Sequence, residues 1–215
     1  MSISAIIKGV GHYTPPTCLT NQALSERLDT SDEWIQTRTG ISQRRIAGPE
    51  EPTSFLAIQA GKAALGNAGV PAKAVDLLIL ATMSPDKPCP ATACSVAEGL
   101  GLKGVGAFDL SAACSGFVYA LEVGSQMVRS GAYRHILVIG AEKLSSLVDW
   151  EDRSTCVLFG DGAGAVVLSA SAQPSSGVLG SVLATVAKGS DAASFDIADK
   201  QRQGAQFLQA FETLK

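Results

Sequence analysis

Hydrophobic runs and amphipathic stretches alternate along most of the chain. Continuous apolar runs rich in β-branched residues predict buried strands at residues 4–10, 75–83, 105–110 and 135–142. Stretches whose apolar residues recur on one face predict helices at residues 30–40, 53–69, 91–101 and 114–131. The chain therefore passes from strand to helix and back several times.

This alternation is typical of right-handed crossovers between parallel strands. We therefore expect an α/β fold, with a mostly parallel mixed sheet and helices on both faces. Two further apolar runs, 163–171 and 177–186, have no helix between them and predict an antiparallel pair. Later residues are polar and then weakly amphipathic, so we expect a first region over 1–187 and a divergent tail with a helical pattern over 188–215.

Local signals predict where two of the helices begin and end. Thr30 and Glu33 have the spacing of a capping box at the start of the first helix. Thr53 is expected to cap the next helix, and Gly69 is expected to end it.

Composition and charge limit the classes of function. A chain of 215 residues, 46% apolar and 17% charged, is long enough to bury a sizeable core. Its net charge of −3 argues against general nucleic-acid binding, which depends on neutralising phosphates. No window approaches the roughly 18 consecutive apolar residues of a membrane helix, and no signal peptide is expected. Five cysteines without a C-x-x-C pair suit a reducing compartment, so we expect a globular cytoplasmic protein.

Cys114 lies where an apolar strand passes through small residues into a predicted helix. The unpaired amides and the dipole at a helix N-terminus favour an anion, and therefore the reactive thiolate form of a cysteine. Such a thiolate can attack a thioester, and its own backbone N–H can help to hold the resulting oxyanion. The alternative is that small residues simply fill a tight corner, since buried cysteines are usually inert. Spacing alone leaves both interpretations open.

The sequence contains three distinctive segments in this order: "DTSDEWIQTRTGISQRRIA" (29–47), "DLSAACSGFVYAL" (109–121) and "FGDGAGAVVL" (159–168). Together they resemble motifs of the β-ketoacyl-acyl-carrier-protein synthase III family of thiolase-like condensing enzymes. The resemblance covers roughly residues 3–187. It implies the N-terminal half of a thiolase-like fold, a homodimer, and Cys114 as the nucleophile that takes an acyl group from acyl-coenzyme A. Malonyl acyl carrier protein would then be the partner in condensation, with no permanently bound cofactor.

The same resemblance implies a site for the nucleotide of coenzyme A. The family uses the residues matching Trp34 and Arg153 to sandwich the adenine, an arrangement that agrees with cation–π and stacking energetics. Thr30 matches a residue near the same base, and Arg38 matches one expected to attract phosphates or the acidic carrier protein. Taken singly, an aromatic residue on an amphipathic helix is usually core, and a lone arginine is usually solvated.

An acyl pocket is implied at Cys89, Leu144 and Phe159. At the Cys89 position the family often has a large aromatic side chain, so the smaller cysteine predicts a pocket that tolerates groups longer than acetyl; refilling of the space by neighbouring side chains is the alternative. Phe159 belongs to the glycine-rich segment, which is not a dinucleotide-binding loop because a predicted strand, rather than a helix, follows it.

The residues after Cys114 depart from the family pattern. The family also uses a histidine and an asparagine from the second half of its fold. Here the two histidines are His12, expected in a loop after the first strand, and His135, on a different strand. Both asparagines, Asn21 and Asn67, precede Cys114, so full condensation is not expected in this chain alone. Metal-ligand spacing is absent, so we expect no metal site.

Three functions remain open at this point. The first is an acyltransferase of the ketoacyl synthase III type, or its nucleophile-carrying part. The second is a catalytically incomplete thiolase-fold subunit whose uncovered apolar face serves an interaction. A flavodoxin-like binding domain is the third, and it is disfavoured because no phosphate-binding loop is credible.

Overall fold

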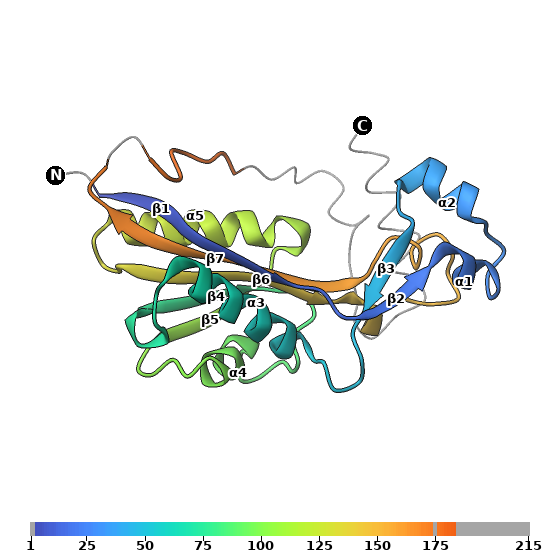
Figure 1. The fold of residues 1–215 in the computed structure, drawn as a ribbon, viewed down its shortest axis with the longest axis horizontal. Helices are drawn as coiled ribbons and strands as arrows, with labels where there is room; N and C mark the ends of the chain where they lie inside the picture. Colours follow the sequence, from blue (N-terminus) through green and yellow to red (C-terminus); the bar gives the residue numbers. More distant parts are fainter. Residues whose placement is uncertain (1–2, 174–175, 184–215) are drawn as a thin grey trace. The chain divides into compact units, whose positions relative to one another are not determined.

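The computed structural model describes residues 3–173 and 176–183 (Figure 1). These residues form two compact units, each assembled from separate stretches of the chain. The sheet unit contains residues 3–14, 48–142 and 162–183, apart from 174–175, and the small unit contains residues 15–47 and 143–161. The predicted boundary at residue 187 and the predicted tail lie outside the described residues.

The sheet unit is built on five strands in the order β1-β7-β6-β4-β5. Strand β4 pairs in parallel with both β5 and β6, whereas β1 pairs antiparallel with β7. The predicted α/β fold with a mixed, largely parallel sheet is therefore confirmed. The strands are β1 (Ser4–Tyr13), β4 (Leu77–Ala81), β5 (Gly106–Leu110), β6 (His135–Lys143) and β7 (Asp161–Ser171).

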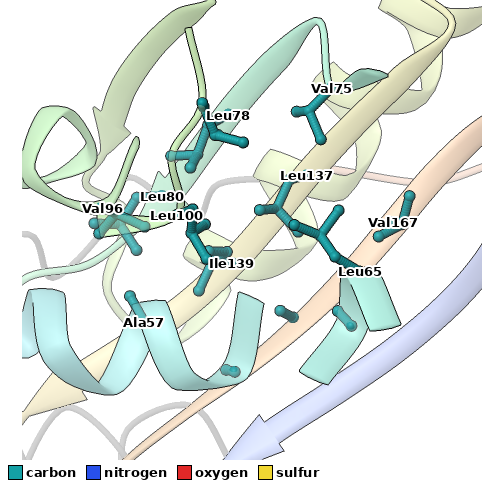
Figure 2. Packing of buried hydrophobic residues seen from close by; sticks show 14 of the residues in the cluster. Ala57, Leu65, Val75, Leu78, Leu80, Val96, Leu100, Leu137, Ile139 and Val167 are labelled. Atoms are coloured by element: carbon teal, nitrogen blue, oxygen red, sulfur yellow. The ribbon is translucent and has the colours of Figure 1, made fainter. Parts of the chain in front are cut away.

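Helices cover both faces of this sheet (Figure 1). On one face, α3 (Thr53–Ala68) and α4 (Thr92–Gly99) pack on alternate residues of β4 and β6, as Figure 2 shows for Leu80 and Ile139. On the other face, α5 (Gly116–Arg129) packs on the intervening residues of the same strands. Because both faces are buried, these strands are continuously apolar in sequence. A short 3₁₀ turn, η1 (Ala72–Ala74), follows α3.

Helix α3 approaches strand β1 closely because glycines face it. A Cβ atom on Gly9 would lie 2.4 Å from the backbone nitrogen of Ala68, and one on Gly11 would lie 2.2 Å from that of Ala64. Any larger residue at these two positions would push α3 away from the sheet.

Carboxylates from other segments, Asp86 and Asp109, cap α3 and α4, whose own N-cap residues, Pro52 and Ala91, make no side-chain cap. The Ser54 amide donates to Asp86 Oδ1 (3.1 Å) near the start of α3. The predicted Thr53 cap is wrong, since Thr53 is the first helical residue and its hydroxyl donates to the Ser84 carbonyl (2.6 Å). Gly69 ends α3 in the left-handed conformation, with φ 62°, as predicted.

The small unit holds a two-stranded antiparallel sheet and two helices around a core of Leu24, Ile35, Cys156 and Val157. The N-cap of its second helix is Ser31, whose hydroxyl accepts the Trp34 amide (3.0 Å), so the predicted capping box at Thr30 is wrong. The elements are β2 (Thr17–Thr20), α1 (Asn21–Ser25), α2 (Asp32–Thr39), β3 (Gln43–Ile46) and the 3₁₀ turn η3 (Leu144–Ser146).

Two predictions near the sheet edge are wrong. Residues 177–183 form no strand, and the antiparallel partner of β7 is β1 instead. Gly177 has φ 93°, which interrupts extended backbone, and the Val178 amide then donates to the Ala5 carbonyl (2.9 Å). Residues 184–186 of the predicted strand lie outside the described residues. His12 lies within β1 rather than in a loop after it.

Within the part of the chain that the structure describes, no helix is long and apolar enough to cross a membrane.

Candidate active site

Cys114 lies in a 3₁₀ turn, η2 (Ala113–Ser115), between the end of β5 and the start of α5. The residue is exposed. Ala113 beside it has φ 46°, a left-handed conformation that costs an alanine backbone strain. On the other side, Gly116 is buried, and a Cβ atom there would lie 3.3 Å from Ala81 Cβ at the end of β4. A strained and closely packed turn therefore presents the thiol to solvent.

The N-terminus of α5 differs from those of α3 and α4. As at α3 and α4, its N-cap residue, Ser115, makes no side-chain cap, and the first turn contains no acidic residue. By contrast, Asp109 accepts hydrogen bonds from the Thr92 and Ala93 amides at the start of α4, both 2.8 Å long. Among the described residues, no side chain takes this role at α5. The amides and the dipole of α5 are thus available to stabilise negative charge beside Cys114.

Cys89 is an exposed residue of the loop between β4 and α4. The start of this loop is fixed by Glu142 at the end of β6, which accepts hydrogen bonds from the Met83 amide (2.8 Å) and the Ser84 hydroxyl (2.5 Å). Burial raises the pKa of Glu142 above its usual value of 4.5, against the effect of these hydrogen bonds. A half-buried acid therefore anchors the segment that leads to Cys89.

Trp34, in α2 of the small unit, lies beside two arginines. The Arg38 guanidinium carbon is 4.4 Å from the centre of its ring, and that of Arg153 is 5.4 Å away. Arg153 also donates to the Asp29 carbonyl and lies 3.6 Å from Asp29 Oδ2. The structure thus brings together Trp34 and Arg153, which are far apart in sequence, and adds Arg38 to them.

Thr30 is half-buried, and its hydroxyl oxygen has no hydrogen-bond partner among the described residues. An orphaned buried hydroxyl is unusual in a native fold. Its donor and acceptor capacity is therefore unused within the described part of the chain.

Leu144 and Phe159, the other two predicted pocket residues, are half-buried in the small unit. Asp161 fixes the segments that carry them, because its carboxylate accepts hydrogen bonds from the Ser145 amide (2.9 Å) and hydroxyl (2.6 Å). It also accepts one from the Ala47 amide (2.7 Å). The pocket role of both residues remains a prediction.

His135 is placed away from the nucleophile. It is the first residue of β6, at the amino-terminal end of the parallel strands. Cys114 follows the carboxyl end of β5, which is the opposite end of these strands. Its Nδ1 lies 2.8 Å from Ser169 Oγ, and burial, with smaller effects of Lys8 and Arg134, lowers its pKa. No cluster of three metal-binding side chains occurs within residues 3–173 and 176–183.

Two buried polar residues of the small unit, Asn21 and Arg44, were not identified from sequence. Each lies in a polar stretch, where asparagine and arginine are usually solvated. No sequence pattern distinguishes a buried residue there from an exposed one.

Comparison with known proteins decides the family. Residues 108–187, which contain Cys114, match the family model for 3-oxoacyl-[acyl-carrier-protein (ACP)] synthase III. The chain is 55% identical over 183 residues to β-ketoacyl-ACP synthase III of Roseiflexus castenholzii, with 85% of this chain and 55% of the relative covered. It is 58% identical over 165 residues to that of Aquifex aeolicus, with 77% and 53% covered. The chain belongs to the β-ketoacyl-ACP synthase III family.

Solved structures of β-ketoacyl-ACP synthase III share the fold. The crystal structure of the Aquifex aeolicus VF5 enzyme matches with a TM-score of 0.77 and 56% identity, over 79% of this chain and 55% of that one. The priming β-ketosynthase of the R1128 polyketide pathway matches with a TM-score of 0.78 and 40% identity, over 80% and 52%. The thiolase-like fold class is therefore confirmed. The chain spans about half the length of the relatives it matches.

Proposed function

We propose that Cys114 accepts an acyl group from acyl-coenzyme A as the first step of β-ketoacyl synthesis. The observation that carries the proposal is an exposed thiol on a strained turn, beside a helix N-terminus that no carboxylate caps among the described residues. The thiolate attacks the thioester carbonyl, and backbone amides at the turn stabilise the oxyanion. The bond to coenzyme A then breaks, and coenzyme A leaves as a thiol with the proton that the cysteine gave up.

The nucleotide of coenzyme A is assigned to the small unit. Trp34 offers a flat apolar surface, and Arg38 and Arg153 supply the positive charge and planar groups that suit adenine and phosphate. The orphaned Thr30 hydroxyl would hydrogen-bond the base or its ribose. No permanently bound cofactor is part of this proposal.

We assign Cys89, Leu144 and Phe159 to contacts with the acyl chain. Because Cys89 is small, groups longer than acetyl would fit. Malonyl acyl carrier protein would be the second substrate. Its malonyl group would lose carbon dioxide, and the resulting carbanion would attack the acyl carbonyl and release Cys114. We place the protein in the cytoplasm as a homodimer that binds neither nucleic acid nor membrane.

An interaction subunit is the second candidate, and a specific observation favours it. Ile7 and Val10 of β1 lie opposite Leu168 and Val166, on the sheet face covered by α5. They are nevertheless 46% and 56% exposed, and Val118 of α5 is 49% exposed. Exposed apolar side chains such as Ile7 and Val10, side by side on one sheet face, are typical of a surface that binds another protein.

Decarboxylation separates the two candidates. The purified chain is mixed with acetyl-coenzyme A and malonyl acyl carrier protein, and released carbon dioxide is measured, with C114A as the control. Release that depends on Cys114 supports the condensing enzyme. A folded chain that releases none, while sedimenting as a stable assembly, supports the interaction subunit.

A further inference from the structure

We propose that Asn21 and Arg44 are positioning residues that hold Trp34 next to Arg153. The inference rests on the proposed function, in which Trp34 and Arg153 bind the nucleotide of coenzyme A. Neither positioning residue would touch the ligand. They would act as a buried polar relay between the two segments of the small unit that carry the binding residues.

Asn21 fixes both ends of α2, the helix that carries Trp34. The residue is 1% exposed. Its side-chain amide donates to Asp32 Oδ1 and to the Ile41 carbonyl, both at 2.7 Å. Asp32 is the first residue of α2, and Ile41 follows the Gly40 that ends it. One side chain therefore holds the helix at its beginning and just beyond its end.

Arg44 connects this amide to the segment that carries Arg153. Its Nη1 donates to Asn21 Oδ1 (2.6 Å), while its Nε and Nη2 donate to the Val157 carbonyl at 2.8 and 2.6 Å. Arg44 is 4% exposed, so these hydrogen bonds are shielded from water.

The turn before Val157 is itself rigid. Asp152 accepts hydrogen bonds from the Ser154 amide (2.9 Å) and the Thr155 hydroxyl (2.7 Å), and the Cys156 amide donates to its carbonyl (3.0 Å). Arg153 lies inside this turn. A displacement of Val157 is therefore expected to move the guanidinium of Arg153.

A buried arginine is costly, which argues that its geometry matters. Among the described residues, no carboxylate lies within ion-pair distance of Arg44, and burial lowers its pKa. An apolar residue of similar size would avoid this desolvation cost if packing were the only requirement. What an apolar side chain cannot supply is the planar fork that reaches Val157 and Asn21 at once.

The contact that the relay supports is sensitive to small shifts. Arg153 lies 5.4 Å from the centre of the Trp34 ring, close to the ~6 Å limit of a cation–π interaction. Movement of either segment by about an ångström would therefore weaken it.

The first test measures the position of Trp34 without ligand. The chain has two tryptophans, so in a W150F background the emission spectrum reports Trp34 alone. R44K keeps the charge but loses the planar fork, and we expect it to shift the Trp34 emission and raise its quenching by iodide. The control R45K makes the same replacement at the next residue of β3, whose guanidinium donates to the Pro16 carbonyl (3.0 Å) and takes no part in the relay. Unchanged Trp34 emission in folded R44K would overturn the inference, and so would an equal shift in R45K.

The second test measures coenzyme A binding by calorimetry. R44K is expected to weaken binding about tenfold, and to have no further effect when W34A is already present. A loss that persists in the W34A background would overturn the positioning role. If the wild-type chain does not bind coenzyme A while R44K still shifts Trp34 emission, the relay stands and the proposed nucleotide site fails.

A third test moves the carboxylate from position 32 to position 21 and asks whether the double variant restores what the single variant loses. N21D can still accept from Arg44, but it places a second carboxylate against Asp32, so we expect Trp34 emission to shift as in R44K. In N21D/D32N the amide introduced at position 32 can donate to the new carboxylate, but the hydrogen bond to the Ile41 carbonyl stays lost, so the emission should return part of the way to wild type. Absence of any recovery in a folded double variant would contradict the relay.

Discussion

The guanidinium of Arg38 lies over the indole ring of Trp34, 4.4 Å from its centre. The two residues are four positions apart on α2, so they face the same side of the helix. Arg153 approaches the same ring from a different segment of the small unit, at 5.4 Å. Trp34 therefore has two cationic neighbours, one local and one distant in sequence.

This arrangement predicts separate contributions of the two arginines to coenzyme A binding. A contact of an exposed guanidinium with the bound nucleotide is worth about 0.5–1 kcal/mol, so R38A and R153A should each weaken binding by roughly two- to fivefold. Calorimetric titration at low and high salt measures this, and both losses should shrink as salt screens the phosphates. Full affinity in either variant would remove that arginine from the site.

Asp109 is predicted to stabilise α4 through its two hydrogen bonds to the Thr92 and Ala93 amides. Loss of such a cap should cost about 0.5–2 kcal/mol, because both amides lose their partner. Urea unfolding of D109A measures the change in free energy. E98Q, at the exposed end of the same helix, serves as the control and should change stability little. Equal effects of the two variants would show that the cap contributes nothing.

Glu142 predicts a specific pH dependence of stability. Its folded pKa is raised above 4.5 by burial, so the folded state holds the proton more tightly than the unfolded state. The stabilising contribution is fully present below pH 4.5 and is lost as pH rises through the raised pKa. Unfolding free energies of wild type and E142Q, measured across this window, should converge or cross as pH rises. A difference that does not vary with pH would contradict the assignment.

Cys89 is predicted to set the length of acyl group that the site accepts. C89F would fill the space left by the small side chain, so the rate of transfer from octanoyl-coenzyme A should fall about tenfold relative to acetyl-coenzyme A. C18S, an exposed cysteine of the small unit, is the matched control. An unchanged ratio of the two rates in C89F would place Cys89 outside the pocket.

The sequence predicted the sheet well because its central strands are buried on both faces. Leu78 and Leu80 face α3 and α4, whereas Leu77 and Ile79 face α5, so the run is apolar throughout. The strand expected at 177–186 is wrong over the described residues, although the segment is also apolar. Gly177 has a positive φ, which breaks the extended backbone, and an apolar composition does not reveal this.

The candidate site was only partly accessible from sequence. Trp34 and Arg153 were joined through the family resemblance, since 118 intervening residues give no local signal. Arg38 is predicted from the resemblance to attract phosphates or the carrier protein, and its contact with the Trp34 ring is an additional finding of the structure. Asn21 and Arg44 were missed because their burial depends on tertiary contacts with Ile41 and Val157, which no period in the sequence records.

The central claim is that Cys114 is the acyl acceptor, and intact-protein mass tests it most directly. The purified chain is mixed with acetyl- or octanoyl-coenzyme A, alongside C114A as the control. We predict a mass increase equal to one acyl group in the wild-type chain and none in C114A. An adduct that persists in C114A, or no adduct in a folded wild-type chain, would contradict the account.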